Sequence, residues 1–156
     1  KITALLTHLG AWSPKPVQLA TAQWLSNPVA CDLWDQAMIE KVQSRLQILH
    51  QGLADLKEEG LPLDFIAPQG AIYMSVQFQC EGMKTANGTL LNDNEAIRDY
   101  LLKEATFAVV PFHAFGVEPE NEDGWCRVSV GAVGAQDIVN AMPRLRKALA
   151  ALQPAS

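Results

Sequence analysis

Cysteine is scarce in this sequence: its three residues, Cys31, Cys80 and Cys126, lie far apart and form no C-x-x-C pair. An odd number of widely spaced cysteines argues against a disulfide framework. No base lies close to any of the three in the sequence, although a catalytic thiol needs one nearby. We therefore expect three reduced and mostly buried thiols in a cytoplasmic protein.

Long apolar runs and clusters of positive charge are also missing. No apolar stretch approaches the ~20 residues that a membrane-spanning helix needs, so we expect no membrane partner and no signal peptide. The formal net charge is −5, and the lysines and arginines are scattered. Because binding to polyanions requires clustered positive charge, this distribution argues against a nucleic-acid partner.

Markers of several other site classes are absent as well. There is no glycine-rich phosphate-binding loop, and no serine lies in a nucleophile elbow. The three histidines, His8, His50 and His113, show no metal-ligand spacing, so no metal site is predicted. His113 lies in a loop and could reach a ligand, although we expect a structural role. The acidic loop at residues 118–123 is predicted to be a solvated surface.

The clearest feature that is present is a stripe of apolar residues spaced three and four apart, which predicts a long helix. Gly60 and Pro62 should end this helix near Glu59. The stripe could form a coiled-coil seam, but we expect it to face a core, since apolar residues make up 49% of the chain. Its members are Ile39, Val42, Leu46, Leu49, Leu53 and Leu56.

The first part of the chain predicts less regular structure. Residues 10–16 contain two prolines and should be irregular, with Lys15 extended because a proline follows it. A short helix is expected over residues 17–25. Asn27 is a candidate N-cap for the long helix, with Pro28 at the first helical position.

The rest of the sequence alternates strand and helix patterns. Strands are predicted at residues 72–78, 107–110 and 125–130, because apolar residues alternate or cluster there. A helix is expected from a capping box at Asn92 to about Ala105, and a last helix carries apolar residues between 138 and 152. The predicted fold is therefore α/β (α+β), a small open-faced sheet of about three strands with helices packed on it.

Arg127 is the main candidate for binding chemistry. It lies in the middle of the predicted strand 125–130, on the face opposite Cys126 and Val128. A guanidinium in a short apolar strand needs a partner, and its planar fork matches a carboxylate. A structural salt bridge or a solvated outer face would also explain it.

Four segments, in this order and at suitable spacing, resemble the C-terminal third of class I/II aminotransferases, pyridoxal-phosphate enzymes of the aspartate-aminotransferase-like fold type I. Each segment alone is moderately specific, whereas the ordered set is strong and covers essentially the whole chain. The segments are residues 10–22 (GAWSPKPVQLATA), 68–74 (PQGAIYM), 109–116 (VVPFHAFG) and 125–129 (WCRVS).

The resemblance implies a division of roles along the chain. Residues 1–28 would be the tail end of a large cofactor-binding domain, and residues 29–156 a C-terminal small domain that closes over the substrate. Arg127 would bind the α-carboxylate of the substrate. Trp12 and Ser13 would lie near a homodimer interface at the edge of the active site. The implied partners are an amino acid, a 2-keto acid and a second copy of the protein.

One element of the resembled family is absent, the serine-rich turn whose lysine holds pyridoxal phosphate. None of the seven lysines has that context, so we expect no catalytic residue in this chain, which should begin beyond the family's lysine and be inactive alone. A carbon–sulfur lyase, a decarboxylase or an aminotransferase-like regulatory module would share the same scaffold. The amino acid used should depend mostly on residues outside this chain.

Overall fold

The computed structural model describes residues 1–9 and 13–154, and the chain divides into two compact units, Lys1–Glu40 and Lys41–Ser156. A helix, α3 (Pro28–Glu58), runs through the boundary between them. Within the described ranges, no helix combines the length and the apolar character needed to cross a membrane.

The first unit contains α1 (Ile2–Leu9), α2 (Lys15–Leu25) and the start of α3. As predicted, Asn27 caps α3, with its Oδ1 accepting a hydrogen bond from the backbone N–H of Ala30 at 3.2 Å. The prediction that Lys15 is extended was wrong, because α2 begins at that residue. Pro16 lies in the first turn, where its missing N–H removes no helical hydrogen bond.

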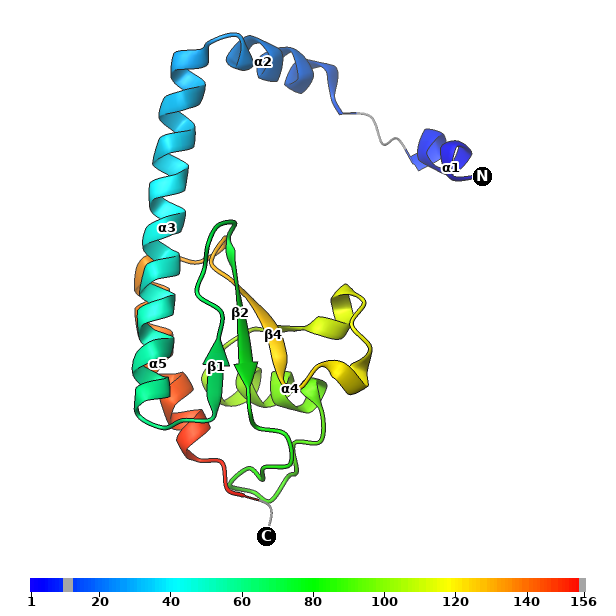
Figure 1. The fold of residues 1–156 in the computed structure, drawn as a ribbon. Helices are drawn as coiled ribbons and strands as arrows, with labels where there is room; N and C mark the ends of the chain where they lie inside the picture. The colour runs from blue at the N-terminus through cyan, green and yellow to red at the C-terminus, as the bar shows by residue number, and fades with distance from the viewer. Residues whose placement is uncertain (10–12, 155–156) are drawn as a thin grey trace. The chain divides into compact units, whose positions relative to one another are not determined.

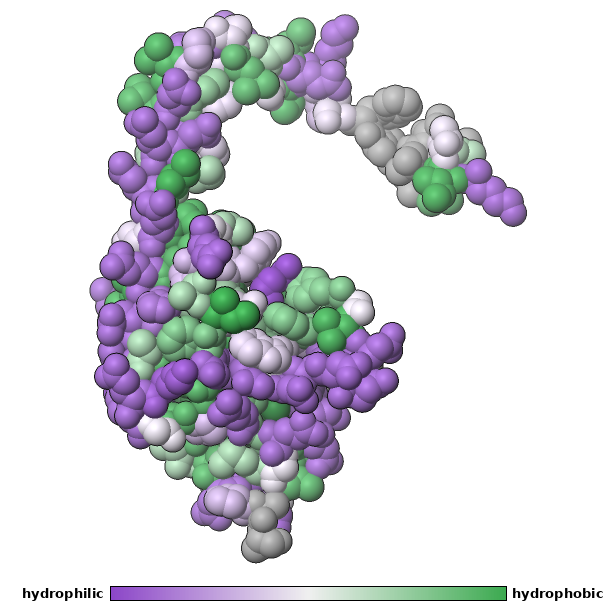
Figure 2. All heavy atoms as spheres, viewed as in Figure 1, coloured by the Kyte–Doolittle hydropathy of each residue, from purple (hydrophilic) through white to green (hydrophobic). Residues whose placement is uncertain are grey.

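Apolar side chains of the first unit lie at its surface. Figure 2 shows hydrophobic residues on the outside of α2 and of the first turns of α3. None of the described side chains before Lys41 is buried. An exposed apolar surface of this kind usually meets another protein surface. Its large members are Ile2, Leu5, Val17, Leu19, Trp24, Leu25, Val29, Leu33, Trp34, Met38 and Ile39.

The second unit is built on a four-stranded antiparallel sheet in the order β1-β2-β4-β3. Figure 1 labels three of these strands, β1, β2 and β4. The strands are β1 (Leu63–Phe65), β2 (Tyr73–Phe78), β3 (Val110–Pro111) and β4 (Trp125–Ser129). The predicted fold class is confirmed, with one strand more than the three expected. The additional strand, β1, has three residues, which is too short to show a period in the sequence.

One face of the sheet is covered by the second half of α3, α4 (Asn94–Ala105) and α5 (Ala135–Ala150), whose apolar residues form a single core with the inward residues of the strands. The predicted stripe on α3 is buried from Leu46 to Leu56, whereas Ile39 is 47% exposed. The stripe therefore faces this core only in the second unit. The inward strand residues are Leu63, Met74, Val76, Phe78, Cys126 and Val128.

Helix α4 begins one residue later than predicted. Asp93, not Asn92, caps it, with Oδ1 accepting from the N–H of Ala96 at 2.8 Å. The following residue, Asn94, is 3% exposed and binds the backbone at the start of β4. Its Nδ2 donates to the carbonyl of Trp125 and its Oδ1 accepts from the N–H of Gly124, both at 3.0 Å. These bonds fasten β4 to α4.

The cysteines follow the expectation from their spacing. Cys80 and Cys126 are buried and Cys31 is half-buried, and all three are free thiols. Burial raises the pKa of Cys80 and of Cys126 to about 12. Both thiols therefore stay protonated at neutral pH and behave as core side chains.

Candidate carboxylate-binding site

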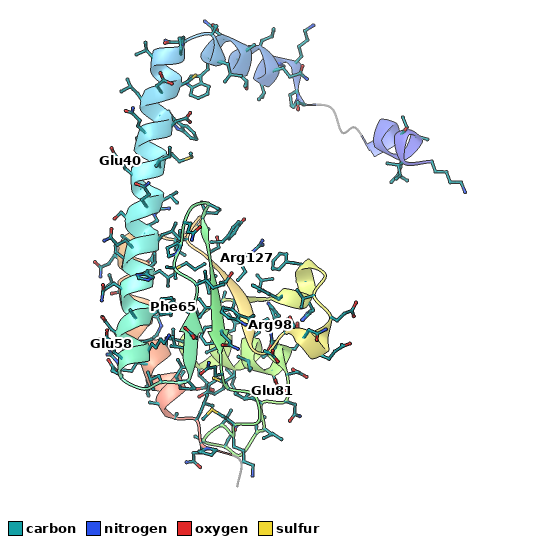
Figure 3. All side chains as sticks on the ribbon, viewed as in Figure 1. Glu40, Glu58, Phe65, Glu81, Arg98 and Arg127 are labelled. Carbon is teal, nitrogen blue, oxygen red and sulfur yellow. The ribbon has the colours of Figure 1, made fainter. Side chains whose placement is uncertain are left out.

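Arg127 occupies the centre of the open face of the sheet. It lies on β4, between Ser75 of β2 and Val110 of β3 in the strand register. Its two neighbours along the strand, Cys126 and Val128, are buried on the opposite face. The predicted orientation of Arg127 is therefore confirmed, and Figure 3 shows it on β4 beside the yellow segment that follows β3.

Two aromatic rings, rather than a carboxylate, contact the guanidinium. The Cζ atom of Arg127 lies 4.2 Å from the ring centre of Tyr73 and 3.8 Å from that of Phe115. The described ranges contain no ion pair or hydrogen bond of the Arg127 side chain. Of the two alternatives to ligand binding, the structural salt bridge is thus not found in this part of the chain.

This arrangement leaves the hydrogen-bonding capacity of Arg127 available. A guanidinium carries five N–H donors, all in its plane, whereas aromatic rings attract it through their faces. The side chain is half-buried, next to the half-buried Ser75 and the exposed Ser129. A fixed, half-desolvated cation without a counter-ion among the described residues suits a planar anion such as a carboxylate.

Phe115 comes from the connection between β3 and β4, which starts with the short 3₁₀ helix η1 (Phe112–Phe115). Phe112 stacks on Trp125 of β4, with ring centres 6.3 Å apart and an interplanar angle of 26°. It also meets Phe115 edge to face at 6.5 Å. Trp125, Phe112 and Phe115 therefore form a continuous series of aromatic contacts that ends at Arg127.

An ionic bridge holds the same connection from its other side. Nδ1 of His113 lies 2.9 Å from Oε2 of Glu122, and Nε2 lies 3.0 Å from Oε1 of Glu95 on α4. The backbone N–H of His113 also donates to Glu122, and Glu95 pairs with Arg98. The prediction of a solvated acidic loop was wrong for Glu122, which is 4% exposed and contacts the backbone N–H and the ring of His113.

The His113 bridge should make stability depend on pH. The hydrogen bond to Glu122, followed by the charges of Glu122 and Glu95, raises the pKa of His113 above its ordinary 6.5, although partial burial opposes the shift. A raised folded-state pKa means that this stabilisation is complete below 6.5 and is lost as pH rises through the raised value. His113→Gln should therefore lower the free energy of unfolding at pH 6, with a difference that shrinks toward pH 9 in urea titrations. A difference that stays constant over this range would contradict the protonated bridge.

The remaining predicted site residues are placed as follows. Trp12 lies outside the described residues. Ser13 is exposed in the first unit, where its carbonyl accepts a hydrogen bond from Nε2 of Gln18 at 2.6 Å, and its predicted place at a dimer interface stays a prediction. Tyr73 and Phe115 were missed as site residues, since no sequence spacing relates them to Arg127. The available signal was that both residues lie in the segments that resemble the family, 68–74 and 109–116.

Most of the lysines lie at the surface of the protein. Lys57 pairs with Asp64, and Lys103 lies beside Glu104. Six of the seven lysines are exposed and Lys84 is half-buried, whereas a lysine that forms a Schiff base is activated by a desolvated pocket. The absence of a cofactor-binding lysine from this chain therefore stays a prediction.

Comparison with known proteins gives a consistent set of relatives. A sequence model of the family described as "Aminotransferase class I and II" matches residues 4–145. A "Probable aspartate/prephenate aminotransferase" of Rickettsia prowazekii is 30% identical over 151 residues, which cover 88% of this chain and 35% of that protein. The chain therefore spans about a third of the length of the curated relatives it matches.

Two solved structures share the fold. The aspartate aminotransferase from Rhizobium meliloti superposes with a TM-score of 0.61 and 29% identity, over 73% of this chain and 26% of that one. The aspartate aminotransferase from Thermus thermophilus with maleate gives 0.62 and 25%, over 83% of this chain and 28% of that one. The small four-stranded sheet with its helices is thus part of a larger architecture in both.

Proposed function

This chain belongs to the class I and II aminotransferase family. On that premise we propose that it is the C-terminal part of a pyridoxal-phosphate-dependent aminotransferase, which transfers an amino group between an amino acid and a 2-keto acid. The observation that carries the proposal is the guanidinium of Arg127, fixed on the open sheet face without a carboxylate partner among the described residues.

In this proposal Arg127 binds the α-carboxylate of the substrate. Two parallel hydrogen bonds to the guanidinium would fix the position and the rotation of the amino acid, so that its α C–H bond is presented to the reacting groups. The presence of maleate, a dicarboxylate, in the Thermus thermophilus relative agrees with carboxylate recognition in this family. Every other catalytic group, including the one that binds the cofactor, would lie outside this chain.

The exposed apolar surface of the first unit supports burial of this part of the chain against a larger domain or a second subunit. Residues 1–28 would complete a large cofactor-binding domain, and residues 29–156 would form the small domain. The exposed apolar side chains of α2 and of the first turns of α3 would be buried by contact with other parts of the protein or with a second subunit. We propose that the complete protein is a cytoplasmic homodimer, with Trp12 and Ser13 near the interface.

Two assays test the proposed function. The complete protein should convert amino acids to keto acids only in the presence of a keto-acid acceptor and pyridoxal phosphate. This chain alone, mixed with pyridoxal phosphate, should give neither a stable shifted visible absorption band nor turnover. Turnover by the isolated chain would contradict the proposed division of roles. Release of ammonia without an acceptor by the complete protein would favour a lyase over an aminotransferase.

A further inference from the structure

Phe115 and Tyr73 reach Arg127 from different parts of the chain. Tyr73 lies at the start of β2 and pairs with Ser129 of β4 in the register, while Phe115 ends η1 in the connection between β3 and β4. Both rings are partly exposed, at 38% and 47%. Two partly exposed aromatic rings that meet at one cation are better explained by that cation than by packing in the core.

We infer that Tyr73 and Phe115 are positioning residues, which hold the Arg127 guanidinium by its faces and leave its N–H edge to a substrate carboxylate. This inference rests on the proposed role of Arg127. An arginine side chain is long and flexible, so a free one would lose rotamer freedom when it binds. Ring contacts fix it beforehand and thereby strengthen carboxylate binding.

The chemistry of the rings explains why they suit this role better than an ion pair. A neighbouring aspartate or glutamate would also fix the arginine, but it would occupy the N–H donors and neutralise the charge that the substrate needs. An aromatic ring attracts the cation through its quadrupole and accepts none of the in-plane hydrogen bonds. The guanidinium is therefore held in position while its donors stay available.

The connection that carries Phe115 is itself held at several points. Phe112 stacks on Trp125, and His113 bridges Glu122 and Glu95. His113 lies two residues before Phe115, within the same short helix. These contacts fix the yellow segment of Figure 3 next to β4, so the position of the Phe115 ring is set by the fold before any ligand arrives.

Substitution of Phe115 in the complete protein tests the inference. Phe115→Leu keeps an apolar side chain but removes the ring, and it should raise both the KM for the amino acid and the inhibition constant of maleate by about 3- to 30-fold. The kcat should change much less, because the arginine holds the carboxylate in the ground state and the transition state alike. Phe115→Tyr keeps the ring and should stay within about twofold of the wild type.

Phe65→Leu is a matched control. The ring of Phe65 also lies near a cation, with Nζ of Lys57 5.7 Å from its centre, but it belongs to the edge strand β1. The same chemical change at that position should leave KM and the maleate inhibition constant unaltered. If Phe65→Leu weakened binding as much as Phe115→Leu does, the effect would be one of general sheet stability and the inference would be overturned.

A double-mutant comparison separates this inference from the proposed function. In an Arg127→Ala background, Phe115→Leu should weaken maleate binding no further, because the ring acts only through the arginine. Equal weakening in both backgrounds would overturn the positioning role. If Arg127→Ala weakens binding but Phe115→Leu does not, the inference fails and the proposed function stands. If Arg127→Ala itself has no effect, the proposed function fails, and the inference fails with it.

Discussion

Arg127→Ala should lower kcat/KM for amino acids in the complete protein by roughly thirtyfold to several thousandfold. This factor corresponds to a loss of about 2–5 kcal/mol of binding free energy in the transition state. The substitution would remove the charge-assisted double hydrogen bond that we propose between Arg127 and the substrate carboxylate. Steady-state kinetics over a range of amino-acid concentrations measures this loss. The absorbance of the bound cofactor should remain intact, since we propose that the cofactor is held outside this chain.

Two further variants sharpen this experiment. Arg127→Lys keeps the charge but loses the planar fork, so it should recover only part of the activity. Arg146→Ala is a matched control, because Arg146 lies on α5, on the covered side of the sheet, and pairs with Glu59 at 2.7 Å. Loss of that surface ion pair should leave kcat/KM unchanged. Unchanged turnover in Arg127→Ala would remove Arg127 from the substrate site.

The second large effect is expected at Gly124, the residue that precedes β4. Its φ is +79°, and a Cβ there would lie 2.3 Å from the carbonyl oxygen of Phe78. The two residues are already joined, because the N–H of Phe78 donates to the carbonyl of Gly124 at 2.9 Å. Gly124→Ala should therefore lower the free energy of unfolding by about 3 kcal/mol or more, through both backbone strain and a clash with backbone atoms. Urea unfolding followed by circular dichroism measures the change.

Gly60→Ala separates the two causes. Gly60 has a similar φ of +82°, but nothing lies within 4 Å of its added Cβ. This variant should lose only the conformational part, about 1 kcal/mol. If both variants lose the same free energy, the close approach to Phe78 has no energetic consequence and the clash argument is wrong. A larger loss at Gly124 would confirm that the close approach to the backbone of Phe78 has an energetic cost.

The sequence alone determined those features that depend on the local spacing of apolar residues and on the residues that end a helix or strand. The apolar spacing of α3, the alternation in β2 and β4, and the stop at Gly60 predicted these elements close to their observed positions. Alternation along β4 also placed Arg127 on the outer face, since successive side chains of a strand point to opposite sides. For the same reason, the main candidate residue could be named before its surroundings were known.

Only the tertiary structure decided what surrounds that residue. Tyr73 and Phe115 meet Arg127 because of strand register and the path of the connection after β3, and neither is encoded in a local pattern. Glu122 likewise meets its partner His113 across nine residues of the chain. Periodicity tells which side a residue faces, whereas contacts between distant segments determine whether a charge is paired, buried or left to bind a ligand.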